Sequence, residues 1–388
     1  MRLDGVRVLD FGWVWAGAVP GQMLGFLGAE VIKVETRKRL DYMRVGRPIV
    51  GTEPDPEQQP MFHNVNRGKR SLTVDFRSDA GRELILELVR HCDVAIENFA
   101  PGVLDRAGLG YERLAEQRPD LVMLSLSGGG QQGPLRELRS YASTIAAYSG
   151  LDSLAGYPGE EPIGIQQAYP DPNASLHGAF ALLAAIYRRN QTGLGEHIDV
   201  SQLEAGLATV GEAVVAVDLL GGDPPVVGNG GYGGEAFQAC LRCRGEDSWV
   251  TVQAEGPEDL RRIAELLGVD PAGTPEAIEQ ALSGWCLDRD HVEAMEVLQA
   301  AGVAAGAVTD AGDRFHHPHY RSRGTYLETE HPVIGWEMVY REPWLWWGET
   351  GQVGRAPLMG EDNEYVVREL LGRSAADYAH LVETGVLQ

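Results

Sequence analysis

The sequence is poor in cysteine and in positive charge. Its 388 residues include four cysteines, Cys92, Cys240, Cys243 and Cys286. These are too few for a disulfide framework at this length, which indicates a reducing compartment. Acidic residues outnumber basic ones by 56 to 33, and the formal net charge is −23. Because nucleic acids and anionic membrane surfaces require extended positive surface, this balance argues against both as partners.

A metal-binding pattern is also missing. Cys240 and Cys243 form the only close cysteine pair, and they lie in a strand-like run. A structural zinc site would normally have a second pair or histidines at matching spacing. His316, His317 and His319 are interpreted as part of a polar loop. We therefore expect no metal site.

One long uncharged run is present, at residues 11–29. It is nearly long enough to cross a bilayer. However, it contains five glycines, Pro20 and Gln22, and it follows Asp4 and Asp10 instead of a basic segment. These features argue against a membrane anchor and a signal peptide. We expect a cytoplasmic protein.

Positive charge is concentrated near the N-terminus. Residues 1–90 contain 14 Lys and Arg against 12 Asp and Glu, whereas the remaining residues contain 19 against 44. The basic clusters are Arg37-Lys38-Arg39 and Asn66-Arg67-Gly68-Lys69-Arg70. Such cations, with a glycine that lets the backbone approach, suit the phosphates of a small ligand. A turn with solvated charges would give the same pattern, so both interpretations stay open.

Strands and helices alternate along the first part of the chain. Residues 6–11 are typical of a strand, residues 17–28 of a helix, and residues 29–35 of a second strand. Further strands are expected at 71–76, 94–98 and 121–127, with helices at 79–91 and 111–117. The right-handed crossover rule then predicts an α/β fold with a mainly parallel sheet and ligands at the carboxyl ends of its strands. The early glycines do not form G-x-G-x-x-G, which argues against NAD.

The composition changes after about residue 220. Residues 228–234 read GNGGYGG, which is either a linker or a mobile active-site flap, and composition alone favours the linker. A hairpin is expected at 237–253, followed by helices at 257–267, 275–286 and 290–301. This pattern predicts a second, smaller α+β domain.

One carboxylate lies between two prolines at an expected helix start. Residues 169–173 read Tyr-Pro-Asp-Pro-Asn and run into an apolar segment at 176–187. The prolines make Asp171 a natural N-cap, worth about 1 kcal/mol. A helix start would also keep this carboxylate ionised, and the unpaired N–H groups there could stabilise an oxyanion beside a nucleophile. Local sequence does not decide between cap and nucleophile.

Taken together, several segments resemble the class III CoA-transferases, of the formyl-CoA transferase and carnitine-CoA transferase type, a family that also contains alpha-methylacyl-CoA racemase. The resemblance spans essentially the whole chain. It is carried by residues 27–35 (LGAEVIKVE), 66–76 (NRGKRSLTVDF), 97–111 (ENFAPGVLDRAGLGY), the stretch around Asp171, 188–200 (RRNQTGLGEHIDV) and 356–372 (APLMGEDNEYVVRELLG). It implies a large Rossmann-like domain at 1–220, completed by about 325–388, a small α+β domain at 221–324, and an interlocked homodimer.

The resemblance also implies roles for individual residues. Asp171 occupies the position of the catalytic aspartate, which attacks an acyl-CoA donor to give a mixed anhydride, then becomes an aspartyl-CoA thioester, and finally passes CoA to an acceptor carboxylate. The positions that hold the adenine and phosphate end of CoA correspond to Arg37, Lys69, Arg106 and Arg139. A loop that covers the aspartate corresponds to Gly230, Gly231, Gly233 and Gly234, which favours a flap over a linker. CoA thioesters would be substrates, with no permanently bound cofactor.

The chain departs from the family pattern in two places. It reads Ala16-Gly17-Ala18 where relatives often have Ala-Gly-Pro, and Trp15 where some transferases have glutamine. Trp15 and Gly17 are therefore expected to shape a different acyl pocket. Racemases need a general acid/base pair, usually including a His-Asp dipeptide, and this chain has Ser140-Tyr141-Ala142 near that place. Transfer is favoured over racemisation, and a non-catalytic CoA-binding protein is the remaining alternative.

Overall fold

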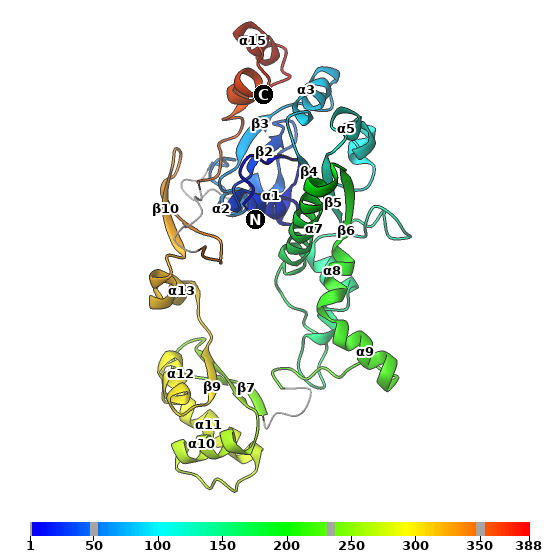
Figure 1. Cartoon of the computed structure of the whole chain (residues 1–388). Coiled ribbons are helices and arrows are strands. Elements are labelled where there is room, and N and C mark those ends of the chain that lie inside the picture. Colours follow the sequence, from blue (N-terminus) through cyan, green and yellow to red (C-terminus); the bar gives the residue numbers. More distant parts are fainter. Residues whose placement is uncertain (1, 47–52, 231–236, 347–353) are drawn as a thin grey trace. The chain divides into compact units, whose positions relative to one another are not determined.

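The computed structural model describes residues 2–46, 53–230, 237–346 and 354–388 (Figure 1). The chain divides into two compact units. The first comprises Met1–Leu151, Ile165–Val214 and Gly324–Gln388, and the second comprises Asp152–Gly164 and Val215–Arg323. Both ends of the chain therefore belong to the first unit.

The first unit is built on a six-stranded parallel sheet. Its strands are β1 (Arg7–Asp10), β2 (Glu30–Glu35), β3 (Arg70–Thr73), β4 (Val94–Glu97), β5 (Val122–Ser127) and β6 (Glu196–Ser201). They lie in the order β3-β2-β1-β4-β5-β6, and every neighbouring pair is parallel. The predicted α/β fold with a parallel sheet is thus confirmed. The strand order reverses between β1 and β4, which is where ligands bind in folds of this kind.

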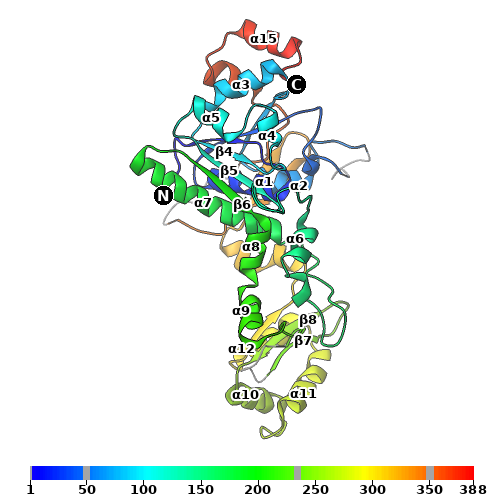
Figure 2. The same ribbon diagram turned by 90° about the vertical axis from the view of Figure 1, so that its right-hand side faces the viewer.

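Helices cover both faces of this sheet. They are α1 (Val14–Phe26), α2 (Pro60–Val65), α3 (Asp79–Val89), α4 (Val103–Arg106), α5 (Tyr111–Gln117), α6 (Ala142–Tyr148), α7 (Pro170–Thr192) and α8 (Gln202–Thr209), with a 3-10 turn η1 (Tyr42–Arg44). Figure 2 shows β4 and β5 between α3 and α5 on one side and α1 and α7 on the other. Alternate strand residues fill two separate cores, because successive side chains point to opposite faces.

The C-terminal segment completes the first unit. It contains the antiparallel hairpin of β10 (Tyr326–His331) and β11 (Gly335–Tyr340), the π-helix η3 (Tyr365–Leu370) and α15 (Ala375–Glu383). Leu381 and Leu387 pack into the core that α3 and α5 share. The Gln388 side chain accepts hydrogen bonds from Thr36 Oγ1 at 2.9 Å and Arg37 N at 2.7 Å, just beyond β2. The last residue of the chain therefore fixes the end of an N-terminal strand.

The second unit is a small α+β body. Its antiparallel sheet has the order β7-β8-β9 and consists of β7 (Phe237–Arg242), β8 (Trp249–Ala254) and β9 (Ala304–Ala307). Helices α10 (Pro257–Leu267), α11 (Pro275–Leu287) and α12 (His291–Ala300) pack on it, and η2 (Asp152–Leu154), α13 (Ala311–His316) and α14 (Pro318–Ser322) are shorter. The predicted hairpin and the three helices after it are confirmed.

One long apolar run forms two helices instead of one. The apolar run at 202–219 forms α8 and then α9 (Gly211–Leu220), with a break at Val210. Val210 has a non-helical backbone, with φ −113° and ψ 28°, and Gly211 follows it. A β-branched residue followed by glycine is a weak helix former, which accounts for the break between α8 and α9.

Candidate active site

Asp171 lies in the first turn of α7, beyond the N-cap position. Tyr169 is the N-cap residue and already has helical dihedrals, with φ −55° and ψ −38°. The expectation that Asp171 is itself the cap is therefore wrong, because the helix begins one residue earlier, at Pro170. The carboxylate of Asp171 accepts a hydrogen bond from another helix, donated by Gln202 Nε2 to Oδ1 at 3.0 Å.

Burial dominates the electrostatics of this carboxylate. Only 9% of Asp171 is exposed, and this desolvation raises its pKa to about 6, although the Gln202 hydrogen bond acts in the opposite direction. We expected the helix start to hold the carboxylate firmly in its charged form. The direction of the shift is the reverse, although a pKa of about 6 still leaves most Asp171 ionised at neutral pH. A buried carboxylate of raised basicity is suited to nucleophilic attack.

Small residues set the position of the helix that carries Asp171. A Cβ at Gly178 would lie 3.0 Å from Leu124 Cδ2, so glycine lets α7 approach β5 closely. Ser175 Oγ donates to the carbonyl of Asp171 at 2.7 Å and lies 3.1 Å from the carbonyl of Ala16, which joins α7 to α1. The position of α7 is therefore fixed by contacts with β5 at Gly178 and with α1 at Ser175.

Two buried ion pairs fix the turn between β1 and α1. Lys33 Nζ donates to Gly12 O at 2.6 Å and to Asp41 Oδ2 at 3.0 Å. Asp41 Oδ1 accepts the N–H of Val14, also at 3.0 Å. Val14 has φ 56°, a strained conformation for a β-branched residue. Burial opposes ionisation of Asp41, but the Lys33 ammonium and the backbone N–H donors outweigh it and lower the pKa of this carboxyl.

The second ion pair contains Lys69. Its ammonium is buried and lies within hydrogen-bond distance of three oxygens, namely Asp10 Oδ2 and Ala18 O, both at 2.7 Å, and Asn66 Oδ1 at 3.0 Å. Burial lowers the pKa of Lys69 to about 8, which still leaves it charged at neutral pH. Since these contacts occupy all three donors, Lys69 holds α1 against β1 instead of presenting its ammonium to solvent.

Asn98, directly after β4, holds the same turn from the other side. Its Oδ1 accepts from Trp13 N at 2.8 Å, and its Nδ2 donates to Trp13 O at 2.9 Å. A Cβ at Gly17 would lie 2.2 Å from Asn98 Oδ1, so only glycine fits this position of α1. Trp15 is half-buried and packs against Val19 and its neighbours.

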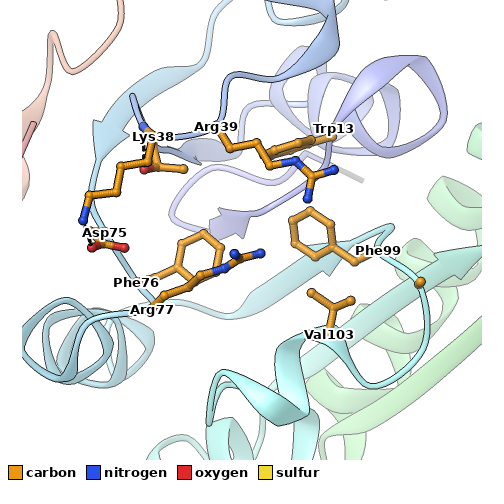
Figure 3. Close-up of a pocket in the computed structure, with 10 residues that line it drawn as sticks. Trp13, Lys38, Arg39, Asp75, Phe76, Arg77, Phe99 and Val103 are labelled. Carbon is orange, nitrogen blue, oxygen red and sulfur yellow. Dashed lines mark hydrogen bonds and ion pairs between the residues drawn. The ribbon is translucent and has the colours of Figure 1, made fainter.

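A basic cavity of about 440 Å³ opens at the carboxyl ends of β2, β3 and β4 (Figure 3). It is lined by three cationic and three aromatic side chains, Lys38, Arg39, Arg77, Trp13, Phe76 and Phe99, together with Thr36, Asp75, Ala100 and Val103. Lys38 pairs with Asp75 at 2.5 Å. The guanidinium of Arg39 lies 5.3 Å from the Trp13 ring centre, and Trp13 meets Phe99 edge to face. Cations beside aromatic faces suit a phosphorylated aromatic ligand.

The other predicted cations lie outside the lining of this cavity. Arg37 is exposed, and its guanidinium donates to Met359 O at 3.1 Å. Arg106 is exposed at the end of α4, and Arg139 is exposed before α6. The basic cluster at 37–39 was recognised in the sequence, but Arg77 was missed, because it follows β3 without another cation beside it.

The structure describes only one of the four glycines of the expected active-site loop. Gly230 lies in the second unit, whereas Gly231, Gly233 and Gly234 fall outside the described residues.

Gln202 was not recognised from the sequence, where it appears only as the first residue of an apolar helix. No local signal could have identified its contact with Asp171, because the two residues come from different helices.

Within residues 2–46, 53–230, 237–346 and 354–388, no group of three or more His, Cys, Asp or Glu side chains could hold a metal ion. Among the helices described, none is long and apolar enough to span a membrane.

Comparisons with known proteins agree with one another. The family model described as "CoA-transferase family III" matches residues 3–363. Formyl-CoA:oxalate CoA-transferase of Rhodopseudomonas palustris (strain TIE-1) is 29% identical over 423 aligned positions, covering 99% of this chain and 96% of that protein. Succinyl-CoA–D-citramalate CoA-transferase of Chloroflexus aurantiacus is 29% identical over 393 positions, covering 98% and 96%. The crystal structure of a CAIB/BAIF family protein from Brucella suis has a TM-score of 0.84 at 29% identity, covering 95% of this chain and 99% of that one.

Proposed function

Because the chain belongs to CoA-transferase family III, and is therefore an enzyme with CoA-transferase activity, we propose that it works through covalent intermediates on Asp171. The carboxylate attacks the carbonyl carbon of an acyl-CoA, expels CoA thiolate and forms a mixed anhydride. The thiolate then attacks the Asp171 carbonyl, releases the donor acid and leaves an aspartyl-CoA thioester. An acceptor carboxylate reverses these steps and leaves as the new acyl-CoA.

The observation that carries this proposal is the buried, basic carboxylate of Asp171 on a rigid first helical turn. Its raised pKa of about 6 makes it a stronger nucleophile than an ordinary aspartate, yet it remains ionised at neutral pH. Its burial keeps water away from the anhydride and the thioester, which would otherwise be hydrolysed. The same isolation lets the binding energy of CoA be used at the reacting carbon.

We propose that the nucleotide end of CoA binds in the basic cavity. Arg39 and Arg77 extend toward Phe99 in Figure 3, so phosphates could pair with the guanidinium groups while adenine contacts the aromatic rings. Arg37, Arg106 and Arg139 are proposed to extend this basic surface. Lys69 is proposed to act indirectly, by holding the β1–α1 turn that places Trp13 in the cavity wall.

Replacing a cavity arginine should weaken acyl-CoA binding without slowing chemistry. For Arg77→Ala we expect KM for acyl-CoA to rise roughly tenfold, the loss of one charge-assisted hydrogen bond, with kcat nearly unchanged. The effect should shrink for a truncated donor that lacks the 3′-phosphoadenosine part. Arg244→Ala, which removes an exposed arginine of the second unit, is the matched control. An equal rise of KM in both variants would contradict this assignment.

We also propose that the subunit forms an interlocked homodimer. Leu176, Phe180 and Tyr187 form an apolar stripe along α7, and Phe180 is 75% exposed. Such a stripe on a long helix is typical of an interface, and a second copy of this chain would cover it. Sedimentation should therefore give twice the chain mass of 42.1 kDa. A monomer at micromolar concentration with full transferase activity would contradict the proposal.

The glycine run at 228–234 is proposed to cover Asp171 during turnover, as the resemblance implies. The acids used by the relatives supply the first substrate panel. We propose formyl-CoA and succinyl-CoA as donors, with oxalate and D-citramalate as acceptors.

Trapping of the intermediate tests the proposed function directly. The enzyme is incubated with an acyl-CoA donor alone and quenched with hydroxylamine, and the peptide containing Asp171 is analysed by mass spectrometry. We expect an aspartyl hydroxamate at Asp171, formed at a rate that matches turnover. Turnover with an unmodified Asp171 would overturn the covalent route, and solvent deuterium at the α-carbon without an acceptor would indicate racemisation.

A further inference from the structure

The proposed mechanism gives no role to Gln202, although its side chain contacts the carboxylate of Asp171. Its Nε2 donates to Asp171 Oδ1 at 3.0 Å, and the glutamine is only 8% exposed. Within the described part of the chain, it is the only side-chain donor to this carboxylate. Asp171 therefore has one oxygen held by an amide, and the two carboxylate oxygens are not equivalent.

The position of this amide is fixed by several contacts of α8. Ser201 caps the helix by accepting from Glu204 N at 3.3 Å. The N–H of Leu203 donates to Gly128 O at 3.0 Å, which ties the helix start to the end of β5. Asn173 Nδ2 donates to Ala205 O at 2.8 Å and links α7 to α8 one turn further on. The donor and its acceptor are thus placed by separate supports, as preorganised catalytic groups are.

We propose that the Gln202 amide is a catalytic donor for the oxyanions that form on Asp171 itself. This inference rests on the proposed function. If Oδ2 attacks the donor carbonyl, Oδ1 becomes the carbonyl oxygen of both the mixed anhydride and the aspartyl-CoA thioester. Gln202 already points at that oxygen before the reaction begins.

Such a donor is needed in the two steps that form and consume the aspartyl-CoA thioester, because negative charge develops on Oδ1 in both. When CoA thiolate attacks Cγ of the mixed anhydride, a C–S bond forms and negative charge moves to Oδ1. The charge returns, the Cγ–Oδ2 bond breaks, and the donor acid leaves with Oδ2. When the acceptor carboxylate attacks the thioester, a C–O bond forms at Cγ, Oδ1 again carries the charge, and CoA thiolate leaves. In both tetrahedral states the negative charge is on Oδ1, the atom to which the Gln202 N–H donates.

A neutral amide is suited to this task. It binds Oδ1 in the carboxylate, in the two acyl intermediates and in the oxyanions, without needing to gain or lose a proton. Because the localised oxyanion is a stronger acceptor than the carbonyl oxygen before it, the hydrogen bond strengthens in the transition state. Oxyanion donors of this kind are worth roughly 10²–10³ in rate.

Gln202→Met tests the proposal, with Gln59→Met as the matched control. Gln59 is likewise buried, and its Nε2 donates to a backbone carbonyl, Asp55 O at 2.9 Å. For Gln202→Met we expect kcat and the single-turnover rate of aspartyl-CoA thioester formation to fall roughly 10²–10³-fold. KM for acyl-CoA should change less than about threefold, since the amide does not touch CoA in the ground state. Gln59→Met should keep the kcat of the parent enzyme.

The pH profile provides a readout that a merely structural role would not move. Because the Gln202 hydrogen bond lowers the pKa of Asp171, its removal should shift the acid limb of kcat/KM to higher pH. Gln202→Glu keeps the size of the side chain but can donate only when protonated. Its activity should therefore decline as pH rises, the opposite of the parent enzyme near its acid limb.

The outcomes separate this inference from the function on which it rests. Failure to trap any adduct on Asp171 of the parent enzyme during turnover would refute the covalent function. A trapped adduct in the parent enzyme, together with unchanged kcat and an unmoved acid limb in Gln202→Met, would refute the role of Gln202 alone. Gln202→Glu guards against misfolding, because its reversed pH dependence requires a folded enzyme.

Discussion

Asp171→Asn is expected to abolish CoA transfer, with a loss of at least ~10³-fold in kcat, because the amide cannot attack a thioester. CoA binding should persist, since the basic cavity is formed by residues of the β2, β3 and β4 ends. Initial rates with a fixed donor and acceptor measure the loss, and calorimetric titration with CoA checks that binding remains. Asp79→Asn, which changes an exposed aspartate in the first turn of α3, should keep the rate of the parent enzyme.

The same variant should be more stable than the parent enzyme at neutral pH. The folded state raises the pKa of Asp171 from 3.8 to about 6, so this carboxyl reduces the free energy of unfolding as pH rises through that range. The reduction is absent below about pH 4, develops between pH 4 and 6, and is about 3 kcal/mol at pH 7. Urea denaturation at pH 4 and pH 7 tests the sign. A stabilisation by Asp171→Asn that is equal at both pH values would contradict the linkage with Asp171.

The strands and their order follow from local patterns and general topology. β1, β2, β4 and β5 are short apolar runs separated by helical segments, and right-handed crossovers leave few ways to join them. The carboxyl ends of these strands were therefore predictable as the ligand-binding edge, and the cavity lies there. Asn98, which directly follows β4, lies where topology alone would place a polar residue of a site.

The details of the site depend on contacts between distant segments. Asp171 was singled out from its two flanking prolines, but its burial and its bond to Gln202 arise from the packing of α7 against α8. The direction of its pKa shift could not be read from the helix start, because desolvation outweighs the favourable effect of a helix N-terminus. The sequence singled out Asp171 as the proposed nucleophile, whereas only the tertiary structure shows its environment.

Lys69 is a second residue whose environment could not be predicted from the sequence. In the sequence it lies among Arg67 and Arg70, where a phosphate-binding cluster is a reasonable hypothesis. In the structure Lys69 directly precedes β3, and its ammonium is buried between Asp10 and the carbonyl of Ala18 in α1. A charge that looks available in a basic run can be fully used by a partner far away in the sequence.

Lys69→Met is therefore expected to act on stability. Removing the ammonium leaves Asp10 charged and buried beside Lys33 alone, and breaking such a pair typically reduces the free energy of unfolding by about 3–5 kcal/mol. Urea denaturation should show this loss directly. If Lys69 instead bound a CoA phosphate, the variant would raise KM for acyl-CoA and leave stability nearly unchanged.

The double variant Asp10→Asn with Lys69→Met makes this test decisive. It removes both charges, while the amide oxygen introduced by Asp10→Asn can still accept the N–H of Gly12 that Asp10 Oδ1 accepts at 2.8 Å. Because no unpaired charge from this pair remains buried, the double variant should regain more than half of the stability lost in Lys69→Met. An additive loss would mean that Lys69 contributes through packing alone. Recovery would show that the loss in Lys69→Met comes from the unpaired charge of Asp10, and that Lys69 is engaged with Asp10 and not with a CoA phosphate.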